Sequence, residues 1–104
     1  MIEEITDETL SRQTAQGLCL VLFYKDSCPY CKTMKGVVEK FGTKNPRVKL
    51  RQINGLENPK SAGELGIEGF PFLLFYKDGQ PTSARQKGLT NPQGLKALLE
   101  MLGY

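Results

Sequence analysis

The sequence predicts an α/β fold built around a mixed β-sheet. Segments with strand patterns alternate with segments of helical period, which favours parallel strand pairs joined by helices. The Asp78-Gly79 dipeptide, which follows an apolar run, is typical of a tight hairpin and adds an antiparallel edge. The length of 104 residues predicts a single domain over residues 1–104.

The first half of the chain contains four expected elements. Residues 2–5 form a short candidate strand, and residues 6–17 a helix with Thr6 or Asp7 as its N-cap and Gly17 as its stop. Residues 18–24, LCLVLFY, are continuously apolar, which suits a strand buried on both faces. The next helix has a buried stripe and is expected to end at Gly42 and Asn45-Pro46; its stripe consists of Cys31, Met34, Val37, Val38 and Phe41.

The second half adds five further elements. Residues 47–54 alternate as a strand does, and residues 58–66 form a short helix that begins with Asn-Pro. Residues 70–76 are a second apolar strand, and residues 82–87 are expected to return antiparallel to it as far as Gly88. The last helix starts at Asn91-Pro92 and stops at Gly103; it carries Leu95, Leu98, Leu99 and Leu102 on one face.

Composition excludes several classes of function. The 14 basic and 11 acidic residues are scattered and give a net charge of +3, without the basic block of a nucleic-acid-binding arm. The first ten residues are acidic and polar where a signal peptide would be basic and then apolar. The longest apolar run, residues 18–24, is too short to cross a bilayer. We therefore expect a cytoplasmic protein with no nucleic-acid or membrane partner.

Two of the three cysteines stand in the segment KDSCPYCKTMKG, residues 25–36. A disulfide across so small a ring removes little entropy from the unfolded chain, so a purely structural bridge is disfavoured. Zinc needs four ligands, but the chain has no histidine and its third cysteine, Cys19, lies alone in an apolar strand. We expect no metal within one chain, while a metal or iron–sulfur cluster shared by two chains remains an open alternative.

A redox-active pair explains the spacing better. Cys31 belongs to the buried stripe, whereas Cys28 falls at the helix entrance, where free N–H groups and the positive end of the helix dipole favour a thiolate. Such positions lower the pKa of a cysteine from about 8.5 to roughly 3.5–7.5. Pro29 takes the first helical position, where its missing N–H costs nothing. One exposed nucleophile beside one sheltered partner predicts thiol–disulfide exchange.

Pro71 is unusual because it opens the apolar strand of residues 70–76. Proline cannot donate to a sheet ladder and is therefore confined to strand starts and edges. A cis Phe70-Pro71 bond would fit this position, although the residues alone favour a trans proline at a strand start.

The order of these motifs resembles the thioredoxin superfamily over nearly the whole chain. The resemblance rests on CxxC after an apolar strand, GIEGFP, LLFYKDG, a later single glycine and an amphipathic last helix. It implies a sheet ordered 1-3-2-4-5 with helices on both faces. It also implies that Cys28 is the nucleophile, that Cys31 resolves the intermediate, and that Pro71 is cis and packs beside the pair. Phe70 and Gly88 then belong to the substrate-binding surface.

The active-site motif differs from that of thioredoxins. Pro29 and Tyr30 form the dipeptide typical of glutaredoxins, and Lys25 resembles a glutaredoxin lysine that helps to hold glutathione. Leu22 and Gln52 stand where thioredoxins carry an aspartate that assists proton transfer and its companion lysine. Water or Lys25 would then have to handle the proton of the resolving cysteine.

The resemblance predicts a monomeric oxidoreductase without a bound cofactor that reduces protein disulfides. Its electrons would come from NADPH through thioredoxin reductase. A glutathione-dependent oxidoreductase is the first alternative, favoured by Pro29, Tyr30 and Lys25. The second is a binding module that docks a partner through Tyr30 and Phe70, with redox chemistry secondary.

Overall fold

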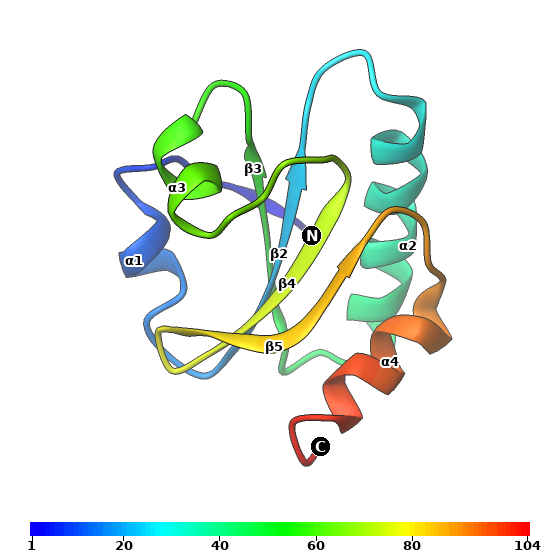
Figure 1. Cartoon of the computed structure of the whole chain (residues 1–104). Helices are drawn as coiled ribbons and strands as arrows, with labels where there is room; N and C mark the ends of the chain where they lie inside the picture. The colour runs from blue at the N-terminus through cyan, green and yellow to red at the C-terminus, as the bar shows by residue number, and fades with distance from the viewer.

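The computed structural model describes all residues, 1–104, and contains one five-stranded sheet ordered β1-β3-β2-β4-β5. The elements, in chain order, are β1 (Glu3–Glu4), α1 (Leu10–Gln13), β2 (Leu18–Tyr24), α2 (Pro29–Lys44), β3 (Lys49–Asn54), α3 (Pro59–Glu64), β4 (Phe72–Lys77), β5 (Gln80–Lys87) and α4 (Pro92–Glu100). β3 pairs parallel to both β1 and β2, whereas β4 pairs antiparallel to both β2 and β5. The predicted mixed sheet and its strand order are confirmed (Figure 1).

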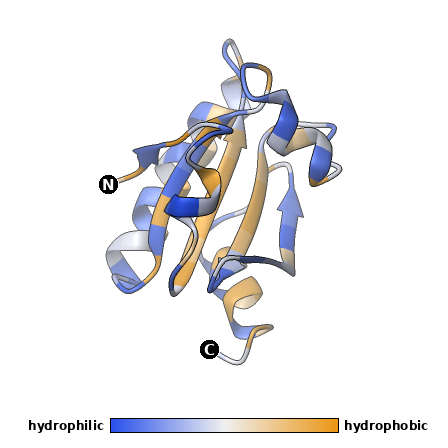
Figure 2. Ribbon diagram, turned by 90° about the vertical axis from the view of Figure 1, so that its left-hand side faces the viewer, coloured by the Kyte–Doolittle hydropathy of each residue, from blue (hydrophilic) through white to orange (hydrophobic).

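The strand β2 divides the interior into two hydrophobic cores. Its residues Leu20 and Leu22 pack in a core with side chains of α2 and α4, such as Met34 and Leu95. Its intervening residues, among them Phe23, pack in the other core with residues of α3 and with Leu10 of α1. α2 and α4 thus cover one face of the sheet and α1 and α3 the other (Figure 1), and Figure 2 shows hydrophobic strands at the centre of the sheet. The uninterrupted apolar run is explained because both faces of β2 are covered.

The hairpin between β4 and β5 forms at the predicted dipeptide. Asp78 and Gly79 have φ angles of 48° and 87°. They are the two central residues of a type I′ turn, both of which need a positive φ. β5 begins at Gln80, two residues earlier than the sequence predicted, because pairing starts immediately after the turn.

The prediction for the first helix, residues 6–17, was wrong at both ends, since α1 already stops at Gln13 and not at Gly17. α1 begins only at Leu10, and neither Thr6 nor Asp7 is its N-cap. Asp7 instead binds the N-terminus of α3: its carboxylate accepts the backbone N–H groups of Ser61 (2.8 Å) and Lys60 (3.2 Å). Its own N–H donates to Oδ1 of Asn58 at 2.8 Å. Asp7 was therefore assigned to the wrong helix, because the helix whose N–H groups it binds lies more than fifty positions further along the chain.

Replacing Asp7 by alanine is expected to destabilise the fold in a pH-dependent way. Desolvation raises the pKa of Asp7, but hydrogen bonds from Ser61 and Lys60 outweigh it, so that its pKa falls below the ordinary 3.8. Because the folded-state pKa is the lower one, the carboxylate stabilises the fold above the unfolded pKa, and this contribution is lost as the pH falls through the folded value. Loss of a capping carboxylate costs about 0.5–2 kcal/mol.

Urea unfolding of Asp7→Ala and the parent chain at pH 7 and at pH 3 measures this effect. The difference in the free energy of unfolding should be present at pH 7 and smaller at pH 3. Glu8→Ala, which removes an exposed neighbouring carboxylate, serves as the control. An equal difference at both pH values contradicts the assignment.

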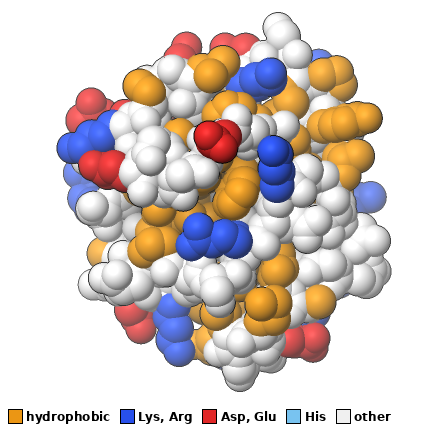
Figure 3. Space-filling view, in the orientation of Figure 1, with side chains coloured by type: hydrophobic (Ala, Val, Ile, Leu, Met, Phe, Trp, Pro, Cys, Tyr) orange, Lys and Arg blue, Asp and Glu red, His pale blue; other side chains and the backbone are white.

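The second helix extends past Gly42 and ends at Lys44, where Asn45 Nδ2 donates to the carbonyl of Phe41 at 2.9 Å. Gly42 was expected to help end the helix, but it instead gives room to the side chain of Leu50, which occupies the space of a Cβ at that position. None of the four helices has the length and apolar character needed to cross a bilayer. On the face drawn in Figure 3, basic side chains are interspersed with acidic and hydrophobic ones.

Candidate active site at the end of the central strands

The pairing register of β2, β4 and β5 brings the candidate residues together at one end of these strands. Phe23, near the end of β2, lies opposite Phe72, so that Pro71 enters the sheet where the chain leaves β2 toward Cys28. Phe72 in turn lies opposite Lys87, and the N–H of Gly88 donates to the carbonyl of Pro71 at 2.8 Å. The segments that contain Cys28, Pro71 and Gly88 thus meet at the same edge of the fold (Figure 1).

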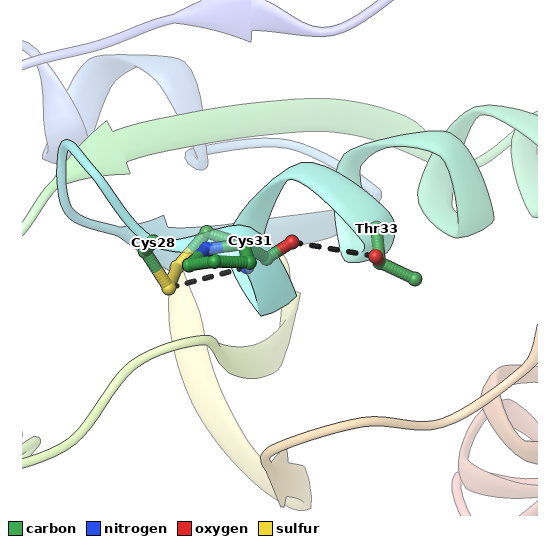
Figure 4. Close-up of a disulfide and its surroundings, with 4 residues drawn as sticks. Cys28, Cys31 and Thr33 are labelled. Carbon is green, nitrogen blue, oxygen red and sulfur yellow. Dashed lines mark hydrogen bonds between the residues drawn. A yellow bond between two sulfur atoms is a disulfide. The ribbon is translucent and has the colours of Figure 1, made fainter.

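The two cysteines form a disulfide at the start of α2, with 5.2 Å between their Cα atoms. Cys28 is the N-cap in an extended conformation, Pro29 follows as the first helical residue, and Sγ of Cys28 accepts the N–H of Cys31 at 3.2 Å (Figure 4). Thr33 Oγ1 donates to the carbonyl of Pro29 at 3.3 Å, which adds a bond across the first turn. Cys28 is partly exposed, whereas Cys31 is only 5% exposed.

This arrangement can stabilise a thiolate on Cys28 in the reduced form. A cysteine at a helix N-terminus lies at the positive end of the helix dipole, which favours a negative sulfur. The hydrogen bond from the Cys31 N–H to this sulfur also becomes stronger when the sulfur is charged. Cys31, one turn further and buried, lacks comparable access to an external disulfide. The two sulfurs are thus chemically unequal although they are adjacent.

The third cysteine is separate from this pair. Cys19 is fully buried in β2, and its Sγ points toward the carbonyl of Gln13 at 3.7 Å. Burial raises the pKa of the Cys19 thiol despite the positive charges of Arg51 and Lys49. A buried thiol with a raised pKa behaves as a small hydrophobic side chain.

Phe70 and Pro71 are the second pair of residues that the sequence predicted for the site. The peptide bond between them is cis, and Pro71 is buried while Phe70 is half-buried. The ring of Phe70 lies directly over Gly55, where its Cε1 and Cζ atoms occupy the space that a Cβ would need. Gly55 is itself fixed, since its N–H donates to the carbonyl of Tyr24 at 2.8 Å. Gly55 was not among the residues predicted for the site, and its one signal in the sequence is a glycine directly after a buried strand.

Gly55→Ala is expected to displace the Phe70 ring. A Cβ at this position overlaps the ring, and such overpacking costs about 1–3 kcal/mol. The measurable outcome is a lower free energy of unfolding together with a higher KM for a protein disulfide. Gly63→Ala is the matched control, because nothing lies within 4 Å of a Cβ there. Equal effects of the two substitutions would show that Gly55 does not position Phe70.

A pocket of about 670 Å³ that is open to the surface lies beside the disulfide. Its lining consists of Leu22, Tyr24, Lys25, Asp26, Ser27, Cys28, Pro29, Cys31, Lys32, Lys35 and Gln52. Tyr30, Phe70, Pro71 and Gly88 are not part of it. The residues predicted for the site therefore fall into two groups, with Lys25 in the pocket and the Phe70-Pro71 segment outside it.

Leu22 and Gln52 are neighbours in the pairing of β2 with β3, and both line the pocket next to Cys31. Gln52 Nε2 and the hydroxyl of Tyr24 both donate to the carboxylate of Glu4, at 2.7 and 2.8 Å. Burial and the hydrogen bond to Glu4 raise the pKa of Tyr24, so this residue stays a neutral donor. Tyr24 is therefore no base for the resolving cysteine at neutral pH.

Two large hydrophobic side chains are exposed near the ends of the elements that form the site. Tyr30 follows Pro29 and is 61% exposed, and Leu89 follows Gly88 and is 48% exposed. Tyr30 was predicted for the site but Leu89 was not, because an isolated leucine after a glycine carries no distinctive pattern. Tyr30 stands between the two cysteines in the sequence, so its exposed ring is available for contact with another chain.

Comparison with known proteins agrees with this geometry. The sequence model of the family described as Thioredoxin matches residues 1–101. The thioredoxin of Listeria monocytogenes is 33% identical over 81 residues, which cover 77% of this chain and 79% of that protein. The thioredoxin of Chlamydia pneumoniae is 31% identical over 99 residues, or 95% and 96% of the two chains.

Solved structures give the same result. A mutant thioredoxin from Halobacterium salinarum superposes with a TM-score of 0.86 at 28% identity, covering 95% of this chain and 88% of that one. The matched family, the strand order and the cysteine pair at the start of α2 agree with one another. The chain belongs to the thioredoxin family and is a protein-disulfide oxidoreductase that uses a redox-active disulfide.

Proposed function

We propose that the chain acts as a single-domain reductase in which Cys28 attacks the disulfide of a protein substrate and Cys31 completes the exchange. The observation that carries this assignment is the inequality of the two sulfurs. Cys28 is partly exposed at the helix N-terminus with an N–H directed at its Sγ, whereas Cys31 is 5% exposed. Attack by an accessible thiolate and resolution by a sheltered one are the two steps of dithiol exchange.

The exchange proceeds through a mixed disulfide. The Cys28 thiolate bonds to one substrate sulfur and releases the other as a thiolate, which takes up a proton. Cys31, once deprotonated, then attacks Sγ of Cys28 and releases the second substrate sulfur. The protein finishes with the Cys28–Cys31 disulfide, the state present in the structure.

The substrate chain is proposed to dock across the segments that surround the disulfide. Phe70 would offer its backbone groups to the substrate chain, while the carbonyl of Pro71 already accepts the N–H of Gly88. Pro29 and Tyr30 form the opposite rim, where the exposed Tyr30 ring supplies apolar contact. Resemblance to the family supports these roles, and the hydrogen bond from Gly88 supports a common surface.

Thioredoxin reductase with NADPH is the proposed electron donor, and the cytoplasm the proposed compartment, because such a donor requires a reducing pool. We further propose that the protein works as a monomer. Insulin reduction in the presence of thioredoxin reductase and NADPH tests the donor. Turnover in this system is the expected result, and activity supported by glutathione alone would show that the donor is wrong.

A glutathione-linked reaction is the second candidate. Lys25 lies in the pocket with both cysteines, and the Pro29-Tyr30 dipeptide is typical of glutaredoxins. The same assay, with glutathione, glutathione reductase and NADPH in place of thioredoxin reductase, measures this activity directly.

A further inference from the structure

The resolving step needs a proton acceptor near Cys31. This residue is only 5% exposed, and its thiol must lose a proton before the sulfur can attack Cys28. Lys25 lines the adjoining pocket, but an ammonium group has no lone pair with which to accept a proton. The acceptor therefore has to be another group that reaches the pocket.

A row of paired residues leads across the sheet from this pocket to β1. Leu22 pairs with Gln52, and Gln52 pairs with Glu4. Residues paired in this way lie on the same face of a sheet, and Leu22 packs in the core that contains the buried side chains of α2. Glu4 and Gln52 thus lie on the face of the sheet that α2 covers, and Cys31 belongs to the buried side of that helix.

Two hydrogen bonds connect Glu4 to the pocket. The hydroxyl of Tyr24 donates to Oε2 of Glu4 at 2.8 Å, and Nε2 of Gln52 donates to Oε1 at 2.7 Å. Tyr24 and Gln52 line the pocket together with Cys31, whereas Glu4 lies outside the lining and is exposed. The hydroxyl oxygen of Tyr24 keeps lone pairs that can accept a hydrogen bond from the pocket. Tyr24 therefore stands between the pocket and a carboxylate that is open to solvent.

We propose that Tyr24 and Glu4 form a proton relay that takes up the proton of Cys31 during the resolving step. The inference rests on the proposed exchange, in which Cys31 resolves the mixed disulfide. Burial and the hydrogen bond to Glu4 raise the pKa of Tyr24, so the hydroxyl keeps a proton between turnovers and is not the final acceptor. The carboxylate of Glu4 is the final acceptor, because the proton of Tyr24 already points at it.

The relay conserves protons and electrons. The Cys31 proton passes through water in the pocket to the hydroxyl oxygen of Tyr24, while the proton of Tyr24 passes to Glu4. The Cys31 sulfur then bonds to Sγ of Cys28, and the bond between Cys28 and the substrate sulfur breaks with its electron pair on the substrate. Glu4 releases its proton to solvent, and the substrate thiolate takes one up. Tyr24 ends neutral, as it began.

Two other carboxylates act on the same tyrosine. Asp26 and Glu57 influence Tyr24 through their charges, but its hydroxyl has one proton to donate, and this proton is directed at Glu4. Asp26 also lines the pocket and is the competing acceptor. The remaining charged residues of the lining are Lys25, Lys32 and Lys35.

A two-phase oxidation separates the resolving step from the first attack. The protein is reduced with dithiothreitol, freed of it, and mixed in a stopped-flow spectrometer with a small excess of 2,2′-dithiodipyridine. Attack by Cys28 releases the first thiopyridone at a rate that rises with the disulfide concentration. Resolution by Cys31 releases the second at a rate that does not. The absorbance of thiopyridone measures both rates.

Glu4→Gln and Tyr24→Phe are each expected to slow the resolving phase about tenfold at neutral pH and to leave the attack phase unchanged. General-base assistance contributes about 10²–10⁴-fold, and water competes with the relay in a pocket that is open to the surface. The double variant should be no slower than either single variant, since the two residues act as a unit. The loss should shrink toward about pH 9, where hydroxide deprotonates the thiol directly.

Glu57→Gln is the matched control, because it removes a carboxylate that acts on Tyr24 through its charge alone. Its resolving phase should keep the rate of the parent protein. Three outcomes overturn the relay: an unchanged resolving phase in either relay variant, an equal loss in Glu57→Gln, or a larger loss in Asp26→Asn than in Glu4→Gln. Absence of the first phase in the parent protein would instead overturn the proposed attack by Cys28.

Discussion

Replacing Cys28 by serine is expected to abolish disulfide reduction, lowering the rate by at least about a thousandfold to that of the assay thiols alone, because the attacking thiolate is lost. Cys31→Ser should instead react once and remain covalently joined to its substrate, since the buried residue that resolves the mixed disulfide is missing. Insulin reduction measures the first result. Mass spectrometry of the Cys31→Ser adduct, before and after dithiothreitol, measures the second.

Cys19→Ser is the matched control for both variants, because Cys19 is buried in β2 away from the pair. Its catalytic rate should remain that of the parent. Full biological activity of Cys28→Ser would indicate a docking module in which the disulfide is secondary. Formation of the stable adduct by Cys28→Ser rather than by Cys31→Ser would reverse the roles of the two residues.

Replacing Phe41 by alanine is expected to lower the free energy of unfolding strongly, because it removes a large buried side chain from the core. Phe41 of α2 is fully buried and meets Phe75 of β4 edge to face, with 5.9 Å between ring centroids. Loss of a buried phenylalanine side chain costs about 3–5 kcal/mol. Domains of this size have a total stability of about 5–15 kcal/mol, so the variant should lie close to unfolding.

Urea unfolding followed by circular dichroism measures the Phe41→Ala effect. Lys40→Ala, one position earlier on the exposed face of α2, should change the free energy of unfolding by no more than about 0.5 kcal/mol. A loss below about 1.5 kcal/mol in Phe41→Ala would show that the core collapses around the missing ring and that the edge-to-face contact contributes little.

Much of the fold could be predicted from local patterns in the sequence. The continuous run of β2 predicted a strand covered on both faces, and the stripe through Met34 and Phe41 predicted the buried side of α2. The Asp78-Gly79 turn could be predicted because its φ angles suit few other dipeptides. The cysteine spacing located the centre of the site, because ring size and the absence of histidine disfavoured the other uses of such a pair.

Long-range contacts were not predictable from local patterns. Asp7 has the residue type of an N-cap, but only the folded chain shows that its partner helix is α3. The role of Gly55 depends on the Phe70 ring, which is distant in the sequence and becomes a neighbour through the pairing of β2 with β3 and β4. The pocket required the same convergence, since Lys25, Lys35 and Gln52 come from three different segments.

The position of β2 at the middle of the sheet bears on how the protein tolerates repeated turnover. Hydrogen exchange and sub-global opening begin at poorly packed edges and reach fully buried strands only when the whole domain unfolds. β2 is paired on both sides and covered on both faces, and the reactive loop begins directly at its end. Its amides should therefore exchange among the slowest in the chain in both redox states. We therefore expect β2 to keep its protection when the disulfide is broken and remade beyond Tyr24.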